Sequence, residues 1–175
     1  MIVVVAGIPG SGKTTLARHL APQLGWALVS KDVIEEALMD ELGTGDVAWR
    51  GQLSRAAHKA MYALVPELGG PVVLEAHFHR GVAEQELSAL GLPLLQVYCR
   101  CPVELAWERY QYRREDPSRH PGHLPEHQDE TATSGWRMTE PRPLDLDVPL
   151  IEVDTSTEVD VVELAAMILG MSERT

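Results

Sequence analysis

The chain of 175 residues lacks an excess of basic residues and lacks long hydrophobic stretches. Its 15 lysine and arginine residues are outnumbered by 26 aspartate and glutamate residues, which gives a net charge of −11. A general nucleic-acid-binding surface needs a basic face, so this balance argues against long nucleic acid as a partner. No apolar run approaches the length of a membrane span, and the start of the chain lacks the pattern of a signal peptide.

Cysteine is scarce as well, occurring only at Cys99 and Cys101. On a strand the two thiols would point the same way, and that geometry does not allow a relaxed disulfide. A metal site of the C-x-C type would need further ligands, and no second pair of cysteines exists. We interpret both as small buried or half-buried residues of a protein in the reducing cytoplasm. The length fits a single domain over residues 1–175.

What the sequence does contain is a complete phosphate-binding loop pattern, G-x-x-x-x-G-K-[ST], over Gly7–Thr14. It lies between a β-branched run that predicts a buried strand, Ile2–Val5, and a run of apolar residues at helical spacing. Glycines let the backbone N–H groups surround a phosphate, and the helix N-terminus adds its dipole. The alternative is a glycine-rich turn with a chance lysine, which the flanking strand and helix disfavour.

This loop predicts a site for ATP and Mg²⁺. The side chain of Lys13 can reach the β- and γ-phosphates, and the hydroxyl of Thr14 can ligate Mg²⁺. The residues expected to bind the nucleotide here are Gly7, Gly10, Ser11, Gly12, Lys13, Thr14 and Thr15.

The rest of the chain alternates between strand and helix patterns. Further strands are predicted over residues 26–30, 72–76, 94–99 and 150–153, and helices over residues 31–42, 47–65 and 82–90, from residue 103, and after a capping-box spacing at residues 155–158. Such alternation predicts a parallel sheet with helices on both faces. Residues 115–149 show no periodicity, which is typical of a lid, a binding loop or a disordered segment.

Several polar residues follow strands and should meet at the carboxyl edge of the sheet. Asp32 could accept the proton of a hydroxyl, orient that hydroxyl or a Mg²⁺-bound water, or simply be an acidic residue in a first helical turn. Glu75 ends an apolar strand as a Walker-B-like acid does, so it could bind Mg²⁺ through water; the alternative is a solvated strand end. We expect Asp32, Glu75, His79 and Arg80 to contact the substrate.

Arginines and histidines surround the start of the expected lid. Arg109 and Arg113 share a helical face and could neutralise a transferring phosphoryl group, although pairing with nearby glutamates on a wet surface is the alternative. The three histidines near residue 120 could suggest zinc, but the prolines among them favour an open loop that contacts substrate or forms lid surface: His120, His123 and His127.

Taken together, these motifs resemble the P-loop kinases of the small-acceptor type, in particular the kinases related to polynucleotide kinase, chloramphenicol phosphotransferase and zeta toxin. The resemblance is carried by Gly7–Thr15, Ser30-Lys31-Asp32, Val72–Glu75 with Phe78-His79-Arg80, Glu108-Arg109 with Arg113, and Asp154-Thr155.

That resemblance implies an α/β P-loop NTPase-type three-layer sandwich. Its five-stranded parallel sheet would have the order 2-3-1-4-5, with helices on both faces and a lid over about residues 115–149. It also implies that Asp32 is the general base, that Arg109 and Arg113 are lid arginines, and that Thr155 lies beside the adenine. Many relatives carry aspartate where this chain has Glu75, which leaves the role of that residue open.

We therefore expect an ATP- and Mg²⁺-dependent kinase that transfers the γ-phosphate to a hydroxyl of a small molecule. Alternatives are a polynucleotide 5′-hydroxyl or a nucleotide-sugar as acceptor, or a non-catalytic ATP-binding switch. A guanine-nucleotide switch would need an N-K-x-D tetrapeptide, and the sequence contains none.

Overall fold

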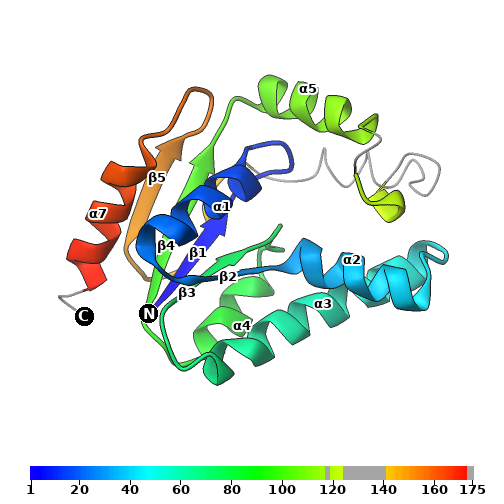
Figure 1. Cartoon of the computed structure of the whole chain (residues 1–175), viewed down its shortest axis with the longest axis horizontal. Coiled ribbons are helices and arrows are strands. Elements are labelled where there is room, and N and C mark those ends of the chain that lie inside the picture. The colour runs from blue at the N-terminus through cyan, green and yellow to red at the C-terminus, as the bar shows by residue number, and fades with distance from the viewer. Residues whose placement is uncertain (117–118, 124–140, 173–175) are drawn as a thin grey trace.

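The computed structural model describes residues 1–116, 119–123 and 141–172 (Figure 1). Strands and helices alternate along the chain, as the sequence pattern predicts. In chain order the elements are β1 (Ile2–Ala6), α1 (Lys13–Leu24), β2 (Ala27–Ser30), α2 (Lys31–Leu42), α3 (Val47–Glu67), β3 (Val72–Glu75), α4 (Ala83–Ala89), β4 (Leu94–Arg100), α5 (Val103–Arg114), the 3-10 turn η1 (Pro121–His123), β5 (Leu150–Asp154) and α7 (Val161–Ser172).

The five strands form one parallel sheet in the order β2-β3-β1-β4-β5, which confirms the predicted order. β1 lies at the centre, and every one of its residues is buried because helices cover both faces. The register places Ser30 of β2 opposite Glu75 of β3, and Glu75 opposite Val5 of β1. The carboxyl ends of these three strands therefore lie side by side.

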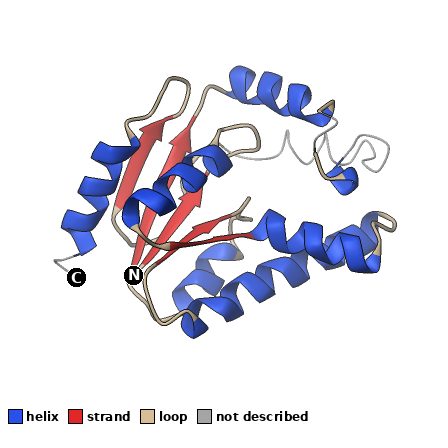
Figure 2. Ribbon diagram, viewed as in Figure 1, coloured by secondary structure: helices blue, strands red, loops and turns tan. Residues whose placement is uncertain are grey.

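Helices cover the sheet in two layers (Figure 2). α1 and α7 pack on one face, where the fully buried Leu20 and Ile168 join the alternate residues of β1, β4 and β5. α3 and α4 pack on the other face through Met61, Val65 and Leu87. Burying one such aliphatic side chain contributes about 1.5–3 kcal/mol to the free energy of folding. These layers therefore stabilise the sheet whose edge carries the polar residues.

The element ends that the sequence predicts lie within one residue of the observed ones, with two exceptions. The capping-box prediction at residues 155–158 is wrong, since α7 begins at Val161 and the Asp160 carboxylate accepts the N–H of Glu163 at 2.9 Å. α3 continues through Pro66 to Glu67, because a proline in the last turn removes only one hydrogen bond of the helix.

Both cysteines are buried and free, as predicted. Burial raises the pKa of Cys99 to about 12, so this thiol stays protonated near neutral pH. None of the helices in the described part of the chain has the length and apolar character needed to cross a membrane.

Candidate active site

The phosphate-binding loop joins β1 to α1 and packs directly beneath α5. Gly10 has a φ of +83°, which favours glycine, and a Cβ atom there would run into the backbone carbonyl of Ala106. The N–H of Ser11 donates to the carbonyl of Ile8 at 3.0 Å and closes the turn. α1 begins immediately afterwards at Lys13, so its free N–H groups face the space enclosed by the loop.

Lys13 is buried within this loop and is 6% exposed. Burial lowers its pKa, while the carboxylates of Glu75 and Asp32 act in the opposite direction. The nearby guanidinium group of Arg113 lowers the pKa further. The charged form of a lysine in this position is stabilised most when a polyanion binds, because phosphate oxygens would replace the solvation that burial has removed.

Glu75 connects the loop to the neighbouring strand. Its Oε1 accepts a hydrogen bond from the Thr14 hydroxyl at 2.9 Å, and its Oε2 accepts one from the Ser30 hydroxyl at 2.7 Å. Glu75 is 1% exposed, so both bonds are made in a desolvated environment. Sequence analysis did not single out Ser30 as a partner of Glu75, although the implied strand order would have placed the two side by side.

The Thr14 and Glu75 oxygens fit a magnesium site. Mg²⁺ prefers hard oxygen ligands and retains several waters, so one hydroxyl and one carboxylate suffice beside substrate phosphates. When bound here, Mg²⁺ would neutralise charge on the phosphate oxygens. Among the described residues, no group of three or more His, Cys, Asp or Glu side chains is arranged to hold a metal by itself.

Asp32 stands in the first turn of α2 and belongs to a small charge network. The Nζ atom of Lys31 lies 3.1 Å from its carboxylate and also bonds to the buried carboxylate of Glu35. Burial by itself would raise the pKa of Asp32, but the ammonium groups of Lys31 and Lys13 outweigh it and hold the pKa well below its usual range. Asp32 is therefore held as a carboxylate by Lys31, with Lys13 acting in the same direction.

Glu35 is a residue of this charge network that sequence analysis missed. It lies four residues after Lys31, so both side chains fall on one face of α2. Burial lowers the pKa of Lys31, but Asp32 and Glu35 outweigh this and raise it. The i,i+4 spacing in Lys31-Asp32-Val33-Ile34-Glu35 was the available signal.

The two predicted lid arginines take different positions. Arg109 lies 4.0 Å from the Cβ position of Gly12 and donates through Nη1 to the carbonyl of Thr155 at 2.9 Å. Thr155 donates its own N–H and hydroxyl to the carbonyl of Arg100, at 2.9 and 3.1 Å. Arg109 thus joins the turn after β5 to the phosphate-binding loop.

Arg113 lies one helical turn further along α5. Burial and the neighbouring guanidinium group of Arg113 lower the pKa of Arg119. Arg113 also lowers the pKa of Lys13, so it interacts with both cations. A polyanion bound beside Arg113 would relieve its repulsion of each of them.

The loop after β3 brings histidines to the opposite wall. His77 interacts electrostatically with Lys13, Lys31 and Asp32, and burial lowers its pKa to about 3. His79 stacks edge-on against it, with ring centroids 5.1 Å apart. Arg80, predicted to contact substrate, donates to the carbonyl of Pro143.

Residues 119–123 rest on α2, where two histidine–carboxylate contacts form. The Nε2 atoms of His120 and His123 lie 3.0 and 3.3 Å from carboxylate oxygens of Asp40 and Glu36, respectively. Burial lowers the pKa of His123 to about 4. His120 and His123 therefore contact two different carboxylates of α2 and do not belong to a metal-binding group among the described residues. His127 lies outside the described residues.

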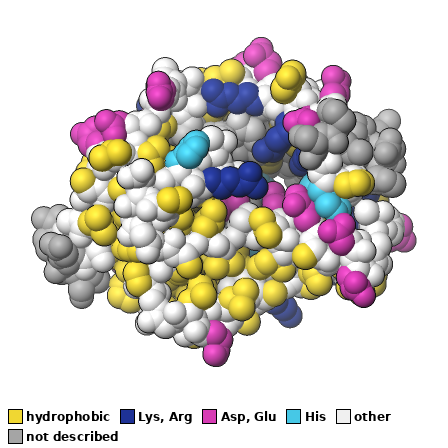
Figure 3. Space-filling view, viewed as in Figure 1, with side chains coloured by type: hydrophobic (Ala, Val, Ile, Leu, Met, Phe, Trp, Pro, Cys, Tyr) yellow, Lys and Arg dark blue, Asp and Glu magenta, His cyan; other side chains and the backbone are white. Residues whose placement is uncertain are grey.

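These groups define the two sides of one cleft. We call residues 7–15 with Glu75 and Arg109 the phosphate side, and α2, His58, residues 77–80 and residues 119–123 the acceptor side. Figure 3 shows basic and acidic side chains gathered around a hollow on this face.

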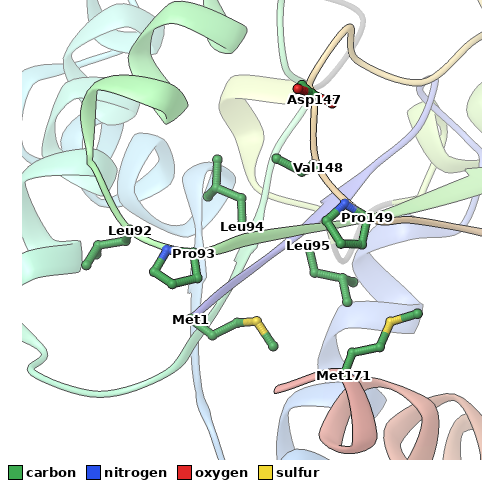
Figure 4. Close-up of a pocket in the computed structure, with 9 residues that line it drawn as sticks. All are labelled: Met1, Leu92, Pro93, Leu94, Leu95, Asp147, Val148, Pro149 and Met171. Carbon is green, nitrogen blue, oxygen red and sulfur yellow. The ribbon is translucent and has the colours of Figure 1, made fainter. Parts of the chain in front are cut away.

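A separate pocket of about 300 Å³ lies at the amino ends of the strands (Figure 4). Its lining is largely apolar: Met1, Leu92, Pro93, Leu94, Leu95, Asp147, Val148, Pro149 and Met171. Because ligands of parallel sheets bind at the carboxyl ends, this pocket is not part of the candidate active site.

Comparison with known proteins agrees with this geometry. A family model described as an AAA domain (AAA_33) matches residues 2–137. The chain belongs to this family. Its fold is that of P-loop kinases, with the nucleotide-binding loop in the expected place.

Among curated proteins, the chain is similar to the cytidylate kinase of Ignicoccus hospitalis, with 32% identity over 111 residues. The match covers 59% of this chain and 59% of that kinase, so the chain spans less than two thirds of the relative's length.

Two solved structures extend the comparison. A Chloroflexus aurantiacus J-10-fl protein, provisionally described as a kinase, superposes with a TM-score of 0.85 at 26% identity, covering 97% of this chain and 96% of that one. A sugar kinase of Janibacter sp. HTCC2649 gives a TM-score of 0.60 at 20% identity, covering 97% and 94%. The second likeness shows the fold alone.

Proposed function

We propose that residues 1–175 form one kinase domain that transfers the γ-phosphoryl group of ATP to a hydroxyl group of a small molecule, with Mg²⁺ as cofactor. The observation that carries this proposal is the Asp32 carboxylate, which follows β2 at the carboxyl edge of the sheet, two strands from the end of β1, and interacts electrostatically with Lys13. A hydroxyl acceptor needs a group that accepts its hydrogen bond and later its proton, and a carboxylate does both.

The residues of the cleft have separate roles in this proposal. Lys13, Arg113 and the N–H groups of the phosphate-binding loop hold the phosphates, while Arg109 and Thr155 support the nucleotide side. The bond from the γ-phosphorus to ADP breaks as the bond to the acceptor oxygen forms, and the acceptor proton passes to Asp32. Because the transition state is loose, a weak base suffices, which agrees with the low pKa of Asp32.

The cytidylate kinases similar to this chain support a second candidate, in which the acceptor is the phosphate of a nucleoside monophosphate. Two carboxylates on the acceptor side, Asp32 and Glu36, disfavour it because they would repel a phosphate dianion. The resemblance to the kinases related to polynucleotide kinase, chloramphenicol phosphotransferase and zeta toxin supports the first candidate. The 5′-hydroxyl of a polynucleotide and a hydroxyl of a nucleotide-sugar are the alternative acceptors of that kind.

The test is release of ADP from Mg²⁺ and ATP across a panel of hydroxyl compounds and nucleoside monophosphates. Lys13→Ala serves as the blank and Lys59→Ala, an exposed lysine of α3, as the matched control. We expect turnover with a hydroxyl compound that falls about 10³-fold in Lys13→Ala and is retained in Lys59→Ala. Turnover with a monophosphate alone would favour the second candidate. Bound nucleotide without turnover would favour a switch.

A further inference from the structure

Three histidines from two distant segments form a wall on the acceptor side. His77 and His79 follow β3, whereas His58 comes from α3. The ring centroid of His79 lies 5.1 Å from that of His77 and 6.0 Å from that of His58. His58 also contacts the rings of Tyr62 and Phe78, at 6.4 and 6.5 Å, which fixes its position against the core.

Two ring nitrogens in this wall have no hydrogen-bond partner among the described residues. They are His58 Nε2 and His77 Nδ1, and both are buried. The Nδ1 atom of His58 lies 3.0 Å from the backbone carbonyl of Ser54, so this nitrogen carries the proton. When the ring is neutral, Nε2 is then a hydrogen-bond acceptor that no described donor reaches.

Buried polar atoms without partners are rare in proteins, because each loses its water without compensation. The wall also lies beside Asp32 at the carboxyl edge of the sheet, because Ser30 of β2 pairs with Glu75 of β3 and Asp32 and His77 each follow two residues later. In agreement, His77 interacts electrostatically with Asp32 and Lys13, and His79 with Lys31. The basic side chains beside the wall are already engaged: Lys31 with Asp32 and Glu35, and Arg80 with the Pro143 carbonyl.

From this arrangement we infer that the wall of His58, His77 and His79 binds the body of an uncharged acceptor with several hydroxyl groups, such as a sugar, cyclitol or nucleoside. The inference rests on the proposed function, which places the reacting hydroxyl at Asp32. Hydroxyl groups both donate and accept, so they match imidazole nitrogens of either tautomer. A site built around such bonds rejects analogues that leave its buried nitrogens unpaired.

The carboxylates beside the wall favour the same class of acceptor, one without charge. An acceptor with a carboxylate or phosphate would bring a second negative charge close to Asp32 and would find Lys31 already bound by two carboxylates. The His79 side chain is exposed, and partial desolvation, with His58 and Lys31 nearby, lowers its pKa, which disfavours a positive charge on this ring.

The test compares matched pairs of acceptors that differ by one charged group, glucose against glucuronate and cytidine against cytidine monophosphate, with inositol and ribose added. ADP release is measured for the unmodified chain, His58→Phe and His79→Phe, with exposed His19→Phe of α1 as control. His58→Gln places an amide near the position of Nε2 and is the rescue variant. Binding of ATP is measured for every variant to report on folding.

We expect turnover with uncharged members of the panel. In His58→Phe and His79→Phe the acceptor KM should rise tenfold or more while the KM for ATP is unchanged, and His58→Gln should recover part of the loss. Preference for glucuronate or cytidine monophosphate, or an unchanged acceptor KM in both variants, would overturn the inference and leave the kinase proposal standing. Bound ATP with no turnover of any compound would overturn both.

Discussion

On the phosphate side, one continuous segment from β1 into α1 contains most of the groups proposed to bind phosphate. The hydrogen bonds around it are 2.7–3.0 Å long, and the one from Ser30 to Glu75 is buried. The acceptor side is assembled from α2, α3, the loop after β3 and residues 119–123. It contains charge pairs at the surface and ring nitrogens without partners. We infer that the first region is the more rigid of the two before any ligand arrives, whereas the second depends on its ligand to pair its ring nitrogens. One buried group of the phosphate side, the Ser11 hydroxyl, also has no hydrogen-bond partner among the described residues.

The largest expected effect lies where the two sides meet. Asp32→Asn should lower kcat about 10²–10⁴-fold while ATP binding persists, because the amide cannot take the acceptor proton. Exposed Glu41→Gln on the same helix is the control. Retained transfer in Asp32→Asn would remove the assignment of this residue as the base.

The low pKa of Asp32 adds a pH test. The carboxylate stays ionised from pH 5 to 9, so we expect no loss of kcat from it toward pH 5. Since the folded pKa lies below the unfolded value, ionised Asp32 stabilises the fold above about pH 4, and this contribution disappears as the pH falls further. An acid limb near pH 6 that vanishes in Asp32→Asn would contradict this expectation.

The rigidity of the phosphate side can be tested with two glycines that share a positive φ. Gly25→Ala meets open space and should cost about 1–2 kcal/mol of unfolding free energy for its φ of +67°. Gly10→Ala adds a clash with the Ala106 carbonyl and should cost about 2–5 kcal/mol in total. Urea unfolding measures both. Equal losses would mean that α5 moves away from the loop easily.

Ser30→Ala tests the hydrogen bond that joins Glu75 of β3 to the neighbouring strand β2. Ser30→Ala leaves Oε2 of Glu75 without its donor, which should cost about 1–3 kcal/mol and raise the Mg²⁺ concentration needed for half-maximal activity. Exposed Ser88→Ala is the matched control. Thermal unfolding and a magnesium titration report the two effects, and an unchanged titration would argue against a metal role for Glu75.

The same contrast explains what could be predicted from the sequence. The phosphate-binding loop and all five strands were identified because their signals are local: a contiguous motif and runs of buried β-branched residues. The strand order followed from family resemblance. The partners of Asp32 and the wall around His79 were missed, since they depend on how α2, α3 and the loop after β3 meet in space. The capping-box error at residues 155–158 arose because Thr155 bonds to Arg100 across the sheet instead.

The smallest expected effect lies at the edge of the acceptor side. His120→Ala removes a contact to Asp40, whose side chain is 75% exposed, so the loss of unfolding free energy should stay within about 1 kcal/mol. We expect kcat to change less than about threefold, because so weak an ion pair contributes little to the position of α2. His19→Ala is the exposed control, and steady-state kinetics at saturating ATP is the measurement. A tenfold loss of kcat in His120→Ala alone would show that residues 119–123 hold α2 and Asp32 in place, which would make the acceptor side as rigid as the phosphate side.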